Sequence, residues 1–437
     1  MTRPFRILFA CPQTLFDVSN GATMQCYTLL QMLSKLGFQT ASYGGGIFDN
    51  PSGAARIPQL EEQLKREKEK LVLLNIDRSA NPENPIRHFF FTGFKSKDWN
   101  KITSEEASKF LSQYSLLLRK FKPDLVLGFG CDALCRSMWM EAKLFGIPTG
   151  YIICNGNHQH YRFPLSDVLL CDSHATAAFY KEKEGLTVHP MGNFINPALV
   201  VSKTHEPRFV TFINPAFAKG AAIAARLILM ANRERPDIPF QIIETRQKFV
   251  NSLRAMRAPD GKIGSAFPNN QTFRNLLIRP ATFNVKEIYE TARVLLAPSL
   301  WYESWGRVAT EAVMNGIPVL ASTSGGLPEA IAGGGICLPA PKECGGTDTP
   351  ADWNVLPSEE SCRPWAEALY RLYDDRSSAI WQSRCEAASR TNSLEACAKK
   401  FLVAVGPLLE RMAGDGDFRQ KGSIRYDGDP IVGQIHL

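Results

Sequence analysis

The sequence predicts an α/β protein of two doubly wound domains, each a parallel sheet covered by helices on both faces. The chain has 437 residues, which exceeds the usual size of one hydrophobic core. Short apolar runs alternate with longer segments of helical period. This pattern starts again after a polar segment, 193–208, that contains two prolines and is interpreted as an interdomain hinge. The carboxyl ends of both sheets are expected to face a central cleft, because ligands of open sheets bind at that edge.

The first half supplies six apolar runs of strand length, separated in several places by helical segments. The predicted strands are 6–11, 38–43, 71–76, 124–129, 150–155 and 167–172, and the predicted helices are 22–36, 104–121 and 132–145. Residues 60–71 are charge-dense and indicate a helix with a solvated face. The N-terminal domain is expected to span 1–195.

The second half repeats the alternation. The predicted strands are 209–214, 240–245, 275–280, 294–299 and 318–323, and the predicted helices are 219–234, 285–293 and 306–316. The C-terminal domain is expected to span 205–390, and a helix at 391–412 to pack back toward the N-terminal domain. Residues 413–437 are rich in Gly and Asp and are expected to form a flexible tail.

Composition excludes several classes of protein. The net charge of +7 is spread along the chain, whereas a nucleic-acid-binding module concentrates its basic residues. The eleven cysteines are odd in number and scattered singly, which favours a reducing compartment over a disulfide framework. No segment approaches the roughly 20 apolar residues that a bilayer requires. A cytoplasmic protein is therefore expected, with peripheral attachment to the inner face of a membrane left open.

One stretch, "ESWGRVATE", brackets a Trp-Gly-Arg segment with two glutamates. Glu303 falls in the loop after strand 294–299, and Glu311 falls about 7.5 Å into the following helix. Carboxylates so spaced could hydrogen-bond different hydroxyl groups of one extended ligand. The alternative is a helix whose first-turn acid complements the dipole. That alternative leaves Glu311 unexplained, because its neighbours are apolar and a carboxylate there needs a partner.

Other candidates follow other predicted strands. Lys219 comes after Asn214 at the end of strand 209–214, where a lysine beside Gly220 could hold a diphosphate, although a surface lysine is the plain alternative. Gly21 opens the helix after the first strand. His158 lies in the loop after strand 150–155 and is an acid–base candidate or an ordinary loop histidine.

No metal site is expected. The Cys131 and Cys135 spacing lacks a second pair of ligands, and the Asp-Gly-Asp segments 415–417 and 427–429 fall in the predicted tail. No cofactor is expected beyond the donor substrate described next.

At these residues the sequence resembles the family 4 glycosyltransferases, whose GT-B fold has two Rossmann-like domains. The resemblance is strongest over 275–332. It includes the family's Glu-x7-Glu motif as Glu303 and Glu311, and a Gly-Gly-x-x-Glu motif that ends at Glu329. The resemblance implies a retaining hexosyltransferase that uses a nucleotide-diphosphate sugar, with a UDP-sugar favoured and a GDP-sugar as the alternative.

The resemblance also implies residue roles. Glu311 would bind the ribose, Glu303 the transferred sugar and Lys219 the leaving diphosphate, while Arg279 and Pro280 would meet the base. The catalytic candidates are thus Glu303, Lys219 and His158. The donor-binding candidates are Gly21, Asn214, Lys219, Arg279, Pro280, Glu303, Ser304, Trp305, Gly306, Arg307 and Glu311.

One departure from the family concerns the phosphate charge. Members commonly have arginine where this chain has Asn214, and Arg307 is a candidate to supply the missing charge. The same departure motivates an alternative function, a non-catalytic GT-B partner or regulatory protein that binds nucleotide sugar. An epimerase is a third hypothesis.

The acceptor (glycan, lipid-linked or small molecule) and the oligomeric state are not specified by the sequence. Loops 44–58 and 77–100 are expected to form the acceptor site. Within them "RHFFFTGF" at 87–94 is either aromatic surface or a buried strand.

Overall fold

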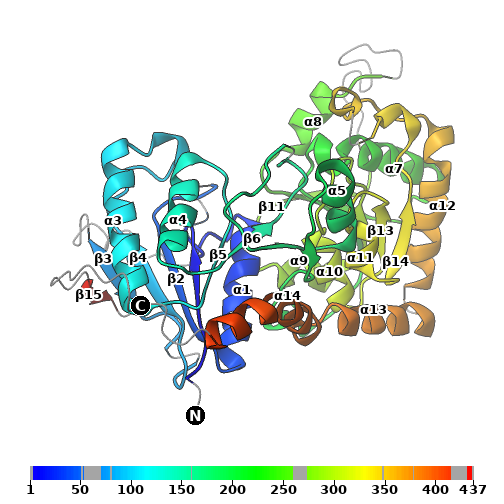
Figure 1. Cartoon of the computed structure of the whole chain (residues 1–437). Coiled ribbons are helices and arrows are strands. Elements are labelled where there is room, and N and C mark those ends of the chain that lie inside the picture. The colour runs from blue at the N-terminus through cyan, green and yellow to red at the C-terminus, as the bar shows by residue number, and fades with distance from the viewer. Residues whose placement is uncertain are drawn as a thin grey trace. The chain divides into compact units, whose positions relative to one another are not determined.

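The computed structural model describes residues 3–50, 53, 70–78, 81–158, 160–258, 273–346, 349–376, 378–414 and 431–435. The chain divides into two compact units (Figure 1). Unit 1 comprises Met1–Cys171, Ala177–Phe194 and Cys397–Leu437, and unit 2 comprises Asp172–Thr176 and Ile195–Ala396. Each unit is described below by itself.

Unit 1 contains a nine-stranded sheet in the order β15-β3-β4-β2-β1-β5-β6-β7-β8, and only the β3/β4 pair is antiparallel. Its strands are β1 (Arg6–Ala10), β2 (Gln39–Gly45), β3 (Leu71–Leu74), β4 (Arg87–Phe91), β5 (Leu125–Gly128), β6 (Thr149–Ile153), β7 (Val168–Cys171), β8 (His189–Pro190) and β15 (Ile431–Ile435). The helices include α1 (Gly21–Lys35), η2 (Trp99–Lys101), α3 (Ser104–Phe121) and α4 (Ala133–Leu144), while α5 (His174–Glu184) and α14 (Leu394–Gly414) carry residues of both units.

Unit 2 contains a six-stranded parallel sheet in the order β11-β10-β9-β12-β13-β14. Its strands are β9 (Phe209–Ile213), β10 (Phe240–Glu244), β11 (Leu276–Pro280), β12 (Ala292–Ala297), β13 (Val319–Ser322) and β14 (Gly335–Leu338). Its helices are α6 (Pro197–Val200), η3 (Phe217–Lys219), α7 (Ala221–Glu234), α8 (Phe249–Ala255), α9 (Lys286–Thr291), α10 (Arg307–Met314), α11 (Leu327–Ile331), η4 (Lys342–Cys344), η5 (Pro350–Asp352), α12 (Glu359–Asp375) and α13 (Ala379–Thr391).

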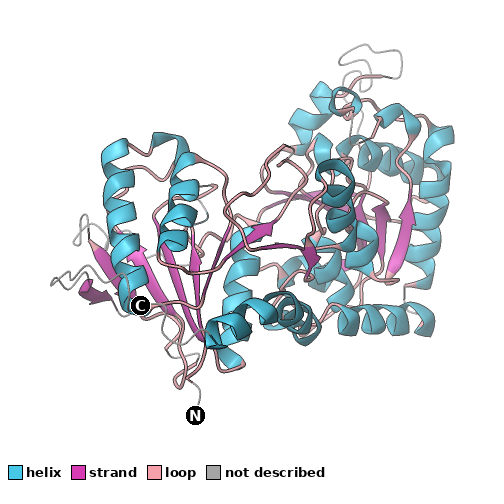
Figure 2. Cartoon of the chain, viewed as in Figure 1, coloured by secondary structure: helices cyan, strands magenta, loops and turns pink. Residues whose placement is uncertain are grey.

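The central strands of the unit 2 sheet are buried on both faces, and for this reason they read as continuous apolar runs. Along β12, Val294 and Leu296 pack in the core that includes α7 and α12, whereas Leu295 packs in the core that includes α10. Side chains that alternate between two cores follow from the two-residue period of a strand. Figure 2 shows the helices flanking the strands.

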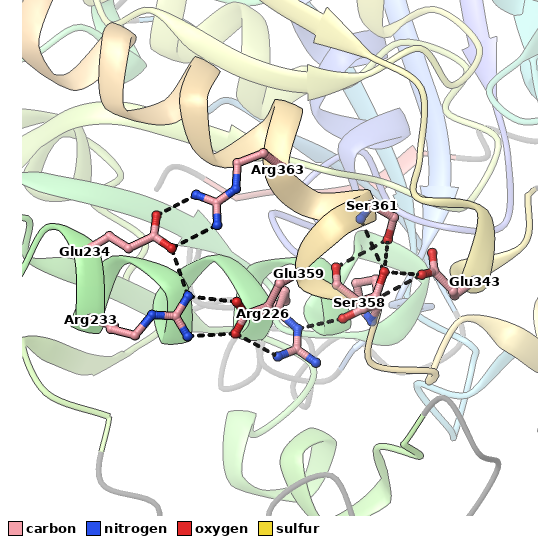
Figure 3. A network of polar contacts seen from close by, with 9 residues as sticks. Arg226, Arg233, Glu234, Glu343, Ser358, Glu359, Ser361 and Arg363 are labelled. Carbon is pink, nitrogen blue, oxygen red and sulfur yellow. Dashed lines mark hydrogen bonds and ion pairs between the residues drawn. The ribbon is translucent and has the colours of Figure 1, made fainter.

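Charged side chains also join α12 to α7 (Figure 3). Arg233 donates to Glu359 at 2.9 and 2.7 Å, and Arg363 donates to Glu234 at 2.7 and 3.0 Å. Both pairs use the two-pronged geometry in which a guanidinium binds a carboxylate most firmly.

The fold class predicted from the sequence, two Rossmann-like α/β units followed by helices, is confirmed. Each predicted strand named above corresponds to an observed strand with ends within two residues. The segment 87–94 is resolved in favour of the buried strand, because Phe89, Phe90 and Phe91 are at most 5% exposed in β4.

Two predictions concern residues that are only partly described. The helix expected at 60–71 lies, up to residue 69, outside the described residues, as do 415–430 and 436–437 of the expected flexible tail. Within that tail, Ile431–Ile435 forms β15 and pairs in parallel with β3. Among the described helices, none is both long and apolar enough to cross a membrane.

Candidate functional site

The candidate site of unit 2 lies at the carboxyl edge of its parallel sheet. Asn214 follows β9, and Arg279 and Pro280 end β11. The strand register places Ile243 of β10 beside both Ile213 and Arg279. The loop after β12 joins the same edge, because the N–H groups of Leu300 and Trp301 donate to the Ala218 carbonyl at 3.0 and 2.9 Å. The sheet thus brings together segments that are distant in sequence, such as Ala218 and Leu300.

Lys219 and Glu303 form an ion pair at the centre of this edge. The Lys219 ammonium lies 2.5 Å from Glu303 Oε1, and the Ser299 hydroxyl donates to the same oxygen at 2.5 Å. The Glu303 side chain is 14% exposed and that of Lys219 is 34% exposed, so both remain accessible. Because Glu303 Oε2 takes no part in these contacts, it is available to accept a hydrogen bond from a ligand.

Glu311 is the buried member of the glutamate pair. Its side chain is 5% exposed, with Oε1 2.7 Å from Arg307 Nε and Oε2 accepting the Tyr289 hydroxyl at 2.7 Å. Tyr289 is fully buried in α9, and this burial, together with the Glu311 charge, raises the pKa of its hydroxyl well above the usual value. The hydroxyl is therefore a permanent donor, and the partner that the sequence required for Glu311 consists of Tyr289 and Arg307.

Glycines bring neighbouring backbone against the loop that carries Glu303. A Cβ on Gly325, which has a φ of +53°, would lie 2.0 Å from the Glu303 carbonyl oxygen. The next N–H, that of Gly326, donates to the same oxygen at 2.7 Å. On another side, a Cβ on Gly220 would lie 2.1 Å from the Pro298 carbonyl oxygen. Only glycine permits such close approach, so the Gly-Gly pair of the sequence motif acts by positioning the Glu303 loop.

The remaining motif residues have structural contacts of their own. The carboxylate of Glu329 accepts the N–H groups of His174 and Ala175, both at 2.8 Å. Ser304 is 5% exposed and donates to Asp172 at 3.2 Å, and Trp305 is 4% exposed and donates to Thr310 at 2.8 Å. Ligand contacts from Ser304 and Trp305 are thus left mainly to their backbone.

Asn214 has a left-handed backbone, with a φ of +65°, which asparagine tolerates better than most residues. Its side-chain Oδ1 is buried with no hydrogen-bond partner among the described residues. Arg307, the candidate for the charge missing at Asn214, has its Nε 2.7 Å from Glu311 Oε1. Gly306, with a φ of +101°, precedes Arg307 as the N-cap of α10. Arg279 Nη1 is 3.5 Å from the buried Gln241 amide oxygen.

Two sequence-predicted residues belong to unit 1. Gly21 is the exposed first residue of α1, after the N-cap Asn20. His158 follows β6 among aromatic rings, with its Nε2 3.5 Å from the Tyr151 hydroxyl and its ring centroid 5.9 Å from that of Phe163. Burial lowers the pKa of His158, which favours the neutral, proton-accepting imidazole at neutral pH.

Sequence reasoning missed Tyr289 and Ser299. Ser299 stands four residues before Glu303 at the end of a strand, and no spacing rule for that geometry identifies it. Arg307 stands four residues before Glu311, so helical i, i+4 spacing already pairs them. The described part of the chain contains no cluster of three or more His, Cys, Asp or Glu residues suited to a metal ion.

Comparison with known proteins identifies the class to which this architecture is similar. Residues 275–342 match the family model described as Glycosyl transferases group 1. This segment contains Glu303, Glu311, Tyr289 and the Gly325–Gly326 pair. A stretch of 88 residues is 38% identical to D-inositol 3-phosphate glycosyltransferase of Corynebacterium aurimucosum. That stretch covers 20% of this chain and only 17% of the relative.

Solved structures with the GT-B fold resemble nearly the whole chain. A glycosyltransferase from Rickettsia africae has a TM-score of 0.62 at 12% identity, with 93% of this chain and 99% of that chain covered. Anabaena HepE in complex with UDP has a TM-score of 0.57 at 12% identity, over 92% and 100% of the two chains. A UDP-forming α,α-trehalose-phosphate synthase from Burkholderia vietnamiensis has a TM-score of 0.58 at 13% identity, over 94% and 98%. At these identities the likeness establishes the fold.

Proposed function

We propose that the chain is a glycosyltransferase that moves a hexose-type sugar from a nucleotide-diphosphate sugar to an acceptor. The observation that carries the proposal is the Lys219–Glu303 ion pair at the carboxyl edge of the sheet, with Glu311 buried in the helix that follows the Glu303 loop. The family match over 275–342 supports it. A UDP-sugar is the favoured donor, and HepE has been solved with UDP and with UDP-glucose. A GDP-sugar is the alternative donor.

In this proposal the two carboxylates have different tasks. The Tyr289 hydroxyl occupies one acceptor position on Glu311, and Arg307 pairs with its charge. A carboxylate has about four acceptor positions, so Glu311 can still accept both ribose hydroxyls. Glu303 accepts hydroxyls of the transferred sugar. The backbone N–H groups of Ser304, Trp305, Gly306 and Arg307 lie between the two, at the N-terminus of α10. Arg279 and Pro280 meet the base.

Lys219 provides the electrostatic part of the proposed reaction. Its ammonium pairs with Glu303 in the ligand-free chain, and a diphosphate would compete for that ammonium with a larger negative charge. As the bond between the anomeric carbon and the diphosphate oxygen breaks, negative charge grows on that oxygen and the nearby cation stabilises it without a metal ion.

The proposed transfer retains anomeric configuration, as the family 4 resemblance implies. The acceptor oxygen forms its bond on the face from which the diphosphate leaves, and the acceptor proton passes to a departing phosphate oxygen. Burial lowers the pKa of His158, which is the candidate to orient that acceptor hydroxyl or, in place of the phosphate oxygen, to accept its proton. The enzyme is proposed to act in the cytoplasm or at the inner face of a membrane.

The test is incubation of the full chain with UDP-, GDP- and ADP-sugars, with nucleoside diphosphate release as the readout. Slow donor hydrolysis is expected, and it should disappear in Glu303→Ala but persist in Glu367→Ala, which alters an exposed glutamate of α12. Thermal shifts with the same donors should be lost in Glu311→Ala. The absence of binding to any nucleotide sugar would refute the proposal.

A non-catalytic nucleotide-sugar-binding protein is the second candidate, favoured by Asn214 in place of a phosphate-binding arginine. It predicts thermal shifts with a donor that Glu311→Ala abolishes, without donor hydrolysis or transfer to any acceptor tested. Isomerised donor in the absence of acceptor would instead favour an epimerase.

A further inference from the structure

Three arginines gather at the amino edge of the unit 2 sheet, opposite the edge that carries the candidate site. Arg208 precedes β9, Arg293 is the second residue of β12, and Arg376 follows the last residue of α12. Within the described part of the chain, none of the three forms an ion pair with a carboxylate. Three uncompensated guanidinium groups in one corner require an explanation.

Tyr373 of α12 contacts Arg293 and the backbone of Arg208. Arg293 Nε donates to the Tyr373 carbonyl at 2.6 Å, and the Arg293 guanidinium carbon lies 4.6 Å from the centre of the Tyr373 ring. The Tyr373 hydroxyl donates to the Arg208 carbonyl at 2.9 Å. Arg376 stands three residues after Tyr373, a spacing that places both on one helix face.

A strand irregularity contributes to this arrangement. The β12–β9 register shifts between Ala292 and Val294, which is the position of Arg293. Such irregularities re-aim the side chain of the extra residue.

Arg376 is the most confined of the three side chains. It is only 7% exposed, and its Nε is buried without a hydrogen-bond partner among the described residues. Burial lowers the pKa of its guanidinium, the Cys385 thiol opposes this shift, and the Arg293 charge adds to it. A buried charge without a counter-ion is costly to the folded state.

Two acids near this corner, Asp237 and Asp374, are held by another arginine. Arg235 holds Asp237 through Nε at 2.9 Å and holds Asp374 through Nη2 at 2.9 Å. These carboxylates therefore complement Arg235 and leave the three other guanidinium groups without a counter-charge.

We propose that Arg208, Arg293 and Arg376 form a binding site for a dianion of the phosphate class. The planar guanidinium fork matches phosphate oxygens, and several forks around one anion give charge-assisted hydrogen bonds. The dianion is either a phosphoryl group on a free solute or the phosphate headgroup of a lipid. The site is separate from the proposed donor residues and does not depend on the proposed function.

Thermal unfolding of the full chain in inorganic phosphate, against sodium chloride of equal ionic strength, tests the proposal. Phosphate should raise the wild-type Tm. Arg376→Met should raise the Tm in chloride, because a buried unpaired charge is removed, and should abolish the response to phosphate. Direct titration should show phosphate binding at least about tenfold weaker in Arg376→Met and in Arg293→Met.

Two controls separate this site from other phosphate contacts. Lys219→Met removes the proposed diphosphate contact, and the part of the phosphate response that depends on Arg376 should persist in this variant. Arg390→Met removes an exposed arginine paired with Glu386 and should alter neither the Tm in chloride nor the response. If Arg376→Met folds poorly, Arg293→Met carries the same test.

Vesicles of phosphatidylcholine with and without phosphatidic acid distinguish the two sources of the dianion. Phosphate binding in solution without vesicle binding indicates a free solute, and Arg376-dependent binding only to phosphatidic acid indicates a lipid headgroup. Either outcome supports the site. A phosphate response that persists in Arg376→Met and Arg293→Met, or the absence of both forms of binding in the wild type, would overturn it.

Discussion

Removal of the Tyr289 hydroxyl offers a direct test of how Glu311 is held. Tyr289→Phe conserves the ring in the core between α9 and α10 but deletes the donor that lies 2.7 Å from Glu311 Oε2. Glu311 is 4% exposed, so water cannot freely replace the lost donor. A hydrogen bond to a charged group contributes about 1.5–3 kcal/mol. We therefore expect the free energy of unfolding of unit 2 to fall by about 2 kcal/mol.

Tyr370→Phe is the matched control for this measurement. The Tyr370 hydroxyl also donates to a carboxylate, that of Glu234, at 3.3 Å, but the bond lies in a partly exposed network. Its loss should change the free energy of unfolding by about 0.5 kcal/mol or less. Urea unfolding with equal m-values for wild type and both variants would make the comparison valid. Equal costs for the two variants would refute the view that burial makes the Tyr289 contact strong.

The same variant gives a second, independent measurement. If Glu311 binds ribose hydroxyls, wild type should prefer UDP to 2′-deoxy-UDP by about tenfold, the value of one charge-assisted hydrogen bond. Tyr289→Phe should reduce this ratio, because Glu311 keeps only Arg307 as an orienting partner. A ratio unchanged from wild type, in a variant that still binds UDP, would show that Tyr289 serves stability alone.

Three further predictions concern other parts of the chain. Gly325→Ala places a Cβ 2.0 Å from the Glu303 carbonyl oxygen and should abolish donor binding. Gly333→Ala changes a glycine that also has a positive φ but lies in open space, so it should lower only the stability of the fold. Thermal shift with UDP-sugars checks both variants. Asp77→Asn removes the charged partner of buried His88 and should lower the free energy of unfolding by about 3 kcal/mol. Asp98→Asn changes an exposed pair with Lys101 and should hardly alter the free energy of unfolding measured in urea. Arg363 and Arg233 hold the pKa of Glu234 down at about 2 despite the opposing effect of burial. The contribution of ionised Glu234 to the free energy of unfolding is therefore complete above its unfolded-state pKa, and it should be lost as pH falls from about 4.5 toward 2. Acid titration of Tm should show a shallower loss over that window in Glu234→Gln than in wild type.

The local pattern of apolar and polar residues in the sequence was sufficient to predict most of the fold. The strands of both sheets were recognisable because a sheet covered on two faces needs apolar side chains on both sides, as Val294, Leu295 and Leu296 show in β12. β15 was not predicted, because a five-residue segment with a central glycine has little strand signal before its partner β3 is known.

Some residues of the candidate site could be predicted from the local sequence, whereas others depend on contacts between segments that are distant in sequence. Glu303, Lys219 and Asn214 were identified because each follows a predicted strand, and parallel strands bring their carboxyl ends to one edge. Tyr289 was not identified, because it lies 22 residues before Glu311 on another helix. Its sequence context is that of any apolar helix face. The sequence established that a carboxylate among apolar neighbours needs a donor, but only the packing of α9 against α10 determines which residue provides it. For the three arginines at the opposite edge, the sequence shows their charge, but only the structure shows that Arg376 is buried with its Nε unpaired among the described residues.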